Sequence, residues 1–191
     1  MMKYFLSALF IFLTSTVYSQ IFTTVQWQGG TPVGDTILYQ PEQKLEWKDF
    51  QGEPDKKSIA IAITSSGFGF SMSMRTRNSK TTLMITVNCF FNKKTSWVKS
   101  GMKSNYALVH EQHHFDITYI TACMFVKKLK AANFTLANYE SLLDKLNNES
   151  YAELEKMQND YDGQTKNGQL KDVQAEWNKK IDQQLAALII N

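Results

Sequence analysis

All three histidines of this chain lie in one short run, His110-Glu111-Gln112-His113-His114. His110 and His114 are four residues apart, a spacing that places two side chains on the same face of an α-helix, one turn above the other. Two imidazoles held in this way can bind one zinc ion, and the glutamate between them can act as a general base on water. The spacing therefore predicts His110 and His114 as metal ligands and Glu111 as the catalytic base.

Other interpretations of the same run remain open. The pattern also occurs as a polar patch on a packed helix, or as a core histidine whose ring is satisfied by hydrogen bonds. His113 could pair with His110 at helical spacing, although a position at the rim of the site is the simpler role. Asp116 could orient a ligand histidine by accepting its hydrogen bond, or could be exposed. A catalytic zinc also needs a third protein ligand, which no further histidine can supply.

The run lies within a segment with helical periodicity. From about Asn105 to Lys130 apolar residues occur nearly all round the helical wheel, which predicts a central helix covered by other elements. Two more helices are predicted at about 135–160 and 169–189, with a polar loop containing two glycines, 161–168, between them.

Strand patterns precede these helices. Residues 58–77 alternate, with Ile59, Ile61 and Ile63 on one face and a break near 65–67, and 81–91 reads as the returning strand after a turn at 78–80. Residues 21–44 form a turn-rich lead-in with one short strand near 37–39. Strands first and helices after predict an α+β fold with a small antiparallel sheet.

Length and composition indicate an ordinary globular protein. The chain has 191 residues, 43% hydrophobic and 20% charged, and this length suits a single domain. The formal net charge of +3 is too small to favour nucleic acid as a partner, because lysines and acidic residues are interleaved along the chain.

The first 19 residues predict a secretory signal peptide. Lys3 gives a short positive region, an apolar stretch follows from Phe5 to Val17, and a cleavage site precedes Gln20. The alternative is an uncleaved N-terminal anchor. With cleavage, residues 20–191 form one exported domain, periplasmic or extracellular, with no further segment able to span a membrane.

The two cysteines, Cys89 and Cys123, allow two interpretations. An exported location permits a disulfide between them, while their apolar surroundings suit free buried thiols. Neither has the close spacing of a zinc-binding or redox motif.

Several spaced motifs together carry a family resemblance. The motifs are LEWKDFQG (45–52), TSWV (95–98), HEQHHFD (110–116), YDGQTKNG (161–168) and QAEW (174–177). With them the chain resembles a bacterial family of predicted secreted zinc-dependent proteases, catalogued as a domain of unknown function. The resemblance implies a zincin-like helical part around the H-E-x-x-H helix, a Zn²⁺ cofactor, and a peptide or protein substrate.

The chain departs from that family at one position. Where the family pattern has a histidine before the loop glycine, this chain has Asn167. If that histidine is the family's third ligand, it is missing here. Asn167 is the candidate at that position, although an asparagine carbonyl is a poor zinc ligand. Asp162 in the same loop is the expected substitute, unless it caps the loop or the last helix. Glu149 and Glu153 on the second helix are weaker candidates.

Three functions follow from these observations. The first is a secreted zinc metallopeptidase that hydrolyses peptide bonds with metal-activated water. The second is a catalytically degenerate, zincin-like exported binding or structural module, in which Asn167 records the lost ligand. A metal-storage or metal-sensing module is the third, although three histidines are few for that role.

Overall fold

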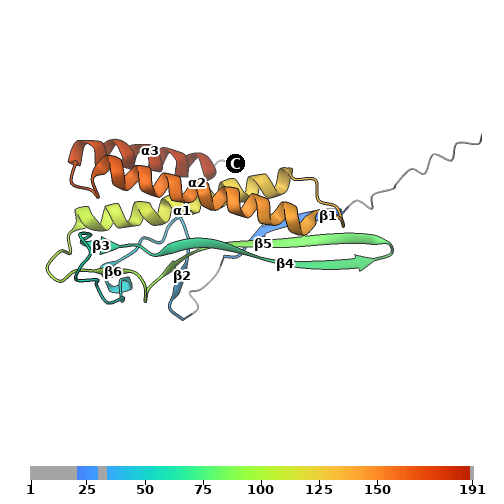
Figure 1. Ribbon diagram of the computed structural model, residues 1–191, viewed down its shortest axis with the longest axis horizontal. Helices are drawn as coiled ribbons and strands as arrows, with labels where there is room; N and C mark the ends of the chain where they lie inside the picture. Colours follow the sequence, from blue (N-terminus) through green and yellow to red (C-terminus); the bar gives the residue numbers. More distant parts are fainter. Residues whose placement is uncertain (1–20, 30–33, 190–191) are drawn as a thin grey trace, which may run out of the picture.

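In the computed structural model three helices lie on one side of a β-sheet, with the first helix between the sheet and the other two (Figure 1). The structure describes residues 21–29 and 34–189, so the predicted signal peptide lies outside the described residues. The helices are α1 (Asn105–Ala131), α2 (Tyr139–Thr165) and α3 (Lys171–Ile189). The main sheet contains β1 (Ile21–Trp27), β2 (Thr36–Leu38), β4 (Ser66–Arg77) and β5 (Lys80–Asn92), and a separate two-stranded sheet pairs β3 (Ala62–Ile63) with β6 (Trp97–Val98). This arrangement confirms the predicted α+β class.

Strand β5 is the centre of the main sheet. The antiparallel hairpin partner β4 runs along one edge of β5, while β1 and β2 share the other edge. Asn78 and Ser79 turn the hairpin with φ values of 49° and 59°, the left-handed pair that a tight two-residue hairpin requires, and the predicted turn is confirmed.

The predicted antiparallel pairing holds for β2 and β4, but the sheet is mixed, because β1 pairs with β5 in parallel. Residues 21–27 were expected to belong to a turn-rich lead-in, but the glycines and prolines that suggested turns begin only after this strand. Ile21 and Val25 face the core from β1, while Phe22 and Thr24 between them are exposed. A short edge strand with threonines at several positions gives a weak pattern, so its long-range pairing decides its structure.

The isoleucines before the hairpin also differ from the expected strand. Only Ala62 and Ile63 of the segment 58–65 are in a strand, β3. The small residues Ala60, Ala62 and Thr64 face inward, while Ile59, Ile61 and Ile63 are 94%, 41% and 39% exposed. The alternation was recognised, but the bulky face is the one that solvent reaches.

Helix α1 is the central helix, as predicted. It contacts β1, β4 and β5 on one side and both α2 and α3 on the other. Ser104 begins the helix by accepting a hydrogen bond from the backbone N–H of Ala107. Phe115, Ile117 and Phe125 are almost completely buried, which explains why the apolar residues surround the wheel.

Helix α2 is longer than predicted and includes more than half of the expected loop, residues 161–165. Residues 161–165 are helical because Tyr161 and Thr165, one turn apart, are fully buried against the core. The helix ends where Lys166, Asn167 and Gly168 adopt left-handed φ values of 49°, 51° and 78°. Asp162 is therefore fixed on the last turns of a helix rather than in a loop.

Two further sequence predictions can be compared with the structure. Cys89 and Cys123 are both free and buried, so the thiol interpretation holds and the disulfide does not. Within the described residues, no helix has the length and apolar character needed to cross a membrane.

Candidate metal centre

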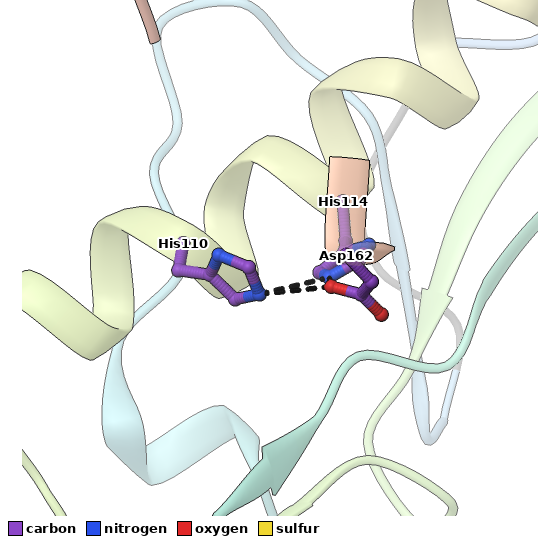
Figure 2. Close-up of side chains that lie close together, drawn as sticks. All are labelled: His110, His114 and Asp162. Carbon is purple, nitrogen blue, oxygen red and sulfur yellow. Dashed lines mark hydrogen bonds and ion pairs between the residues drawn. The ribbon is translucent and has the colours of Figure 1, made fainter. Parts of the chain in front are cut away.

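Three potential ligand atoms converge between α1 and α2. The Nε2 atoms of His110 and His114 are 3.2 Å apart, and Oδ1 of Asp162 lies 3.1 Å from the first and 3.0 Å from the second (Figure 2). Among the described His, Cys, Asp and Glu residues, these three form the group able to hold a metal ion, with ligand atoms within 4.8 Å of one another. The three atoms converge because His110 and His114 lie one turn apart on α1, and Asp162 lies in the last turn of α2, which packs against α1.

The side chain of Gln174 on α3 fixes the tautomer of His110. Nδ1 of His110 lies 2.8 Å from Oε1 of Gln174. The amide nitrogen of Gln174 donates to the Tyr161 hydroxyl, which itself donates to the His110 carbonyl, and to Oδ1 of Asn178, so the amide oxygen of Gln174 faces the imidazole. His110 therefore donates from Nδ1–H, and its Nε2 presents a lone pair toward the cluster.

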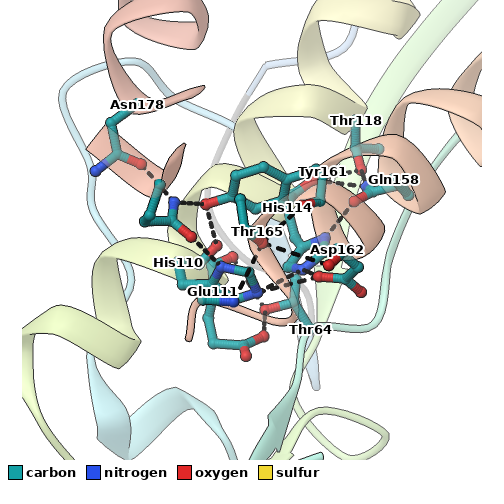
Figure 3. A network of polar contacts seen from close by, with 12 residues as sticks. Thr64, His110, Glu111, His114, Thr118, Gln158, Tyr161, Asp162, Thr165 and Asn178 are labelled. Atoms are coloured by element: carbon teal, nitrogen blue, oxygen red, sulfur yellow. Dashed lines mark hydrogen bonds and ion pairs between the residues drawn. The ribbon is translucent and has the colours of Figure 1, made fainter. Parts of the chain in front are cut away.

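Gln158 on α2 does the same for His114. Its Oε1 accepts a hydrogen bond from Nδ1 of His114, while its Nε2 donates to the His114 carbonyl at 2.9 Å and to Thr118 at 3.2 Å (Figure 3). Because a backbone carbonyl can only accept, the orientation of this amide is determined. Both histidines thus direct Nε2 lone pairs at one point.

The close approach of three acceptor atoms, Nε2 of His110, Nε2 of His114 and Oδ1 of Asp162, indicates whether a metal ion would fit between them. Two imidazole lone pairs and a carboxylate oxygen at 3.0–3.2 Å repel one another unless a proton or a cation lies between them. Burial lowers the pKa of His114, but its hydrogen bond and charge contact with Asp162 outweigh burial and raise it overall. For Asp162 the signs are opposite. Burial raises the pKa of this carboxyl, but the hydrogen bonds and charges of the two histidines outweigh burial and hold the pKa below its usual range. The site therefore favours positive charge, and the donor set fits Zn²⁺.

Tyr161 and Gly168 hold the rings from behind. The Tyr161 ring stacks on His110 with centroids 4.7 Å apart and meets His114 edge-on at 5.0 Å. A Cβ on Gly168 would lie 3.3 Å from Nδ1 of His110, so a larger residue in this turn would crowd the ring. The Gly168 carbonyl accepts a hydrogen bond of 2.7 Å from Tyr106.

Glu111 lines the same cleft as His110, His114 and Asp162. Its side chain is buried, and its Oε2 lies 2.8 Å from the Thr64 hydroxyl (Figure 3). Thr64 directly follows β3, so this contact joins α1 to the segment 59–64, called here the strand wall. Both line a cleft of about 800 Å³ bounded by residues 59–64, α1, α2 and the turn after α2.

The other residues considered as third ligands are placed elsewhere. Asn167 lies in the turn after α2 and lines the cleft, exposed, with its backbone N–H bonded to the Asp162 carbonyl at 2.8 Å. Glu149 and Glu153 both reach Lys128, at 4.0 and 3.0 Å. Of these candidates, only Asp162 meets the two histidines.

His113 and Asp116 lie on another side of α1 from the cluster. Nε2 of His113 is 3.5 Å from Asp182 on α3, and burial lowers the pKa of His113. Asp116 accepts hydrogen bonds from Tyr39 at 2.7 Å and from Gln112 at 2.9 Å, not from a histidine. The interpretation of Asp116 as the orienting acceptor for a ligand histidine is wrong. From its position on α1, the Asp116 side chain faces Tyr39, which directly follows β2, and not the ligand histidines.

Sequence reasoning missed Gln158 and Thr64, and gave Gln174 no role. A signal for Gln158 was present, because it precedes Asp162 by four residues, the same spacing that joins His110 and His114. No local pattern marks Thr64, whose partner is 47 residues away.

Comparison with known proteins identifies no relative: no family model, no curated protein and no solved structure matches the chain significantly.

Proposed function

We propose that this protein is an exported zinc-dependent peptidase with a zincin-like helical part. The observation that carries the proposal is the convergence of His110, His114 and Asp162 at 3.0–3.2 Å, with the Glu111 carboxylate in the same cleft. The family resemblance of the motifs and the apolar N-terminal segment support the activity and the export.

The donor set suits a catalytic zinc rather than a structural one. Two imidazole nitrogens and one carboxylate oxygen are the ligand set expected when one position is left for water, and Asp162 here replaces the histidine of the family pattern. Zinc held by these residues would supply a Lewis acid and make water acidic enough to ionise near neutral pH.

The protein's own groups would then handle the proton. Glu111 would take a proton from the attacking water and deliver it to the leaving amine. Its hydrogen bond with Thr64 holds the carboxylate toward the cleft, so that the base does not have to be ordered when substrate binds. Gln158 and Gln174 keep the histidine Nε2 atoms free by holding Nδ1–H.

The cleft wall formed by residues 59–64 favours an extended peptide as substrate. β3 pairs with β6 on one edge, and among the described residues its other edge has no strand partner. Unpaired strand edges bind extended chains by backbone hydrogen bonds. Exposed isoleucines along the same wall would contact apolar side chains of such a peptide.

The decisive experiment measures metal and hydrolysis together. The mature protein should contain about one zinc per chain and cleave a peptide mixture in a chelator-sensitive manner. Glu111→Gln should keep the zinc and lose about 10²- to 10⁴-fold in cleavage rate, because only proton transfer is removed. A protein that takes up no zinc from excess metal at neutral pH would rule the proposal out.

A catalytically degenerate binding module is the second candidate, and Asn167 favours it. This residue lies at the cleft where the family pattern has a histidine. In this case the chain would bind zinc weakly, and wild-type and Glu111→Gln proteins would be equally inactive. The same two proteins therefore separate the two functions.

A further inference from the structure

The charges that line the cleft are unbalanced. Within the described residues, three carboxylates line it, those of Glu111, Glu155 and Asp162, and no lysine or arginine does. The chain as a whole carries a formal charge of +3, so this acidity is a property of the cleft and not of the composition.

Two of the three carboxylates already have partners. Asp162 contacts both histidines, and Glu111 is bonded to Thr64. Glu155 is exposed on α2, and no hydrogen bond or ion pair joins it to another described residue. A zinc ion would offset the charges of Asp162 and Glu111 but would leave that of Glu155.

Three lysines near α2 and the strand wall have partners outside the cleft. Lys156 pairs with Asp160, and Lys128 pairs with Glu149 and Glu153. On the strand wall, Lys99 donates to the Ser58 carbonyl. At the opposite end of the cleft Lys171 lies over the Tyr106 ring, with its Nζ 5.9 Å from the centroid. These four lysines therefore do not pair with Glu155, and no lysine or arginine among the described residues lines the cleft beside it.

The position of Glu155 relates it to the reacting centre. It lies seven residues before Asp162 on α2, on nearly the same helix face, which corresponds to about 10 Å along the axis. An extended peptide advances about 3.3 Å per residue, so for a peptide that lies along α2 Glu155 would be about three residues from the bond at the candidate metal site.

We infer that the cleft selects extended peptides with a lysine or arginine about three residues from the cleaved bond, and that Glu155 is the specificity-determining residue. The isoleucine wall contacts apolar side chains of the same peptide, and the Glu155 carboxylate pairs with its basic side chain. This inference rests on the proposed peptidase function, since it names the substrate class of the same site.

The test is a binding measurement with hydrolysis disabled. Short fluorescein-labelled peptides of one apolar sequence carry Lys, Gln or Glu three residues to either side of the central bond, and zinc-loaded Glu111→Gln protein is titrated by fluorescence anisotropy. We expect the Lys peptide to bind about 2- to 5-fold more tightly than the Gln peptide and the Glu peptide more weakly again, because exposed ion pairs are worth little each. The preference should shrink as salt is added.

Charge reversal at Glu155 provides the decisive comparison. Glu155→Lys in the same background should invert the order of the three peptides, while Glu176→Lys, the same change at an exposed position of α3 outside the cleft, should preserve it. An order unchanged by Glu155→Lys, or moved equally by Glu176→Lys, would overturn the inference, as would the absence of binding by every peptide.

Failure of the inference and failure of the peptidase proposal give different results. If Glu155→Lys inverts binding but no zinc-dependent cleavage occurs with wild-type protein, the selectivity stands and the peptidase assignment fails. If cleavage requires zinc and Glu111 but the preference ignores Glu155, the peptidase stands and the selectivity fails.

Discussion

On the cleft side of α1, His110 and His114 direct their Nε2 atoms at Asp162, whereas on another side His113 faces Asp182 and Asp116 binds Tyr39. His110 and His113 are almost equally buried, 6% and 5% exposed, so burial does not distinguish the two sides. The difference lies in convergence. Three acceptors meet at one point on the cleft side, while on the other side each polar group serves a separate contact that fastens neighbouring segments to the helix.

The comparison predicts its largest effect for exchange of a histidine. His114→Ala removes a ligand and should weaken zinc affinity by at least about 100-fold, since loss of a supporting partner alone costs 10- to 100-fold. His113→Ala, one residue away, should leave zinc affinity within about 2-fold, because its ring is not in the ligand group. Calorimetric titration with zinc measures both, and equal losses would show that the two sides of α1 are not distinct.

A smaller effect on zinc affinity is expected from replacing Gln158, which contacts His114 on the cleft side of α1, than from replacing a histidine ligand. Gln112, which contacts Asp116 on the other side, provides the comparison. Gln158→Leu removes the acceptor that fixes the His114 tautomer and should cost about 10-fold in zinc affinity. Gln112→Leu removes the side chain that accepts from the Leu45 N–H and donates to Asp116, so it should lower the melting temperature without changing zinc affinity. Thermal melts and zinc titrations of the two variants test this contrast; a Gln158→Leu protein of unchanged affinity would contradict the assigned role.

The smallest effect is the pH dependence of the metal-free protein, in which the two sides oppose each other. The pKa of His114 is raised in the folded state, so its stabilisation is present below the unfolded pKa of about 6.5 and is lost as pH rises through the folded value. The pKa of His113 is lowered, so the folded state loses stability as pH falls below about 6.5.

Together they predict a maximum in the melting temperature of chelator-treated protein near pH 6.5. His114→Gln should flatten the slope above this pH, and His113→Gln should flatten the slope below it. Zinc should reverse the dependence above pH 6.5, because metal binding requires neutral imidazole. A melting temperature that rises steadily from pH 6 to pH 8 without metal would contradict the assigned role of His114.

Particular elements explain how far sequence reasoning extended. The α+β class, the hairpin turn and the covered α1 helix were predictable, because each depends on periodicity or on residues close in the chain. β1 was missed because a parallel pairing with β5, about 60 residues later, has no local signature. The exposed isoleucines were placed on one face correctly, but alternation alone does not say which face is buried.

That His110, Glu111 and His114 share a helix could be predicted from the sequence, because a four-residue spacing and an apolar run are local properties of the chain. The contact of Asp162 with the two histidines depends on packing, since α1 and α2 must pack with Tyr161 buried before a residue 48 positions later can reach His114. It also separated His114 from His113, neighbours in the chain, because a helix turns successive side chains about 100° apart and different elements then cover each one. Spacing placed the two imidazoles together, and packing supplied the carboxylate and the two glutamines that complete the candidate metal site.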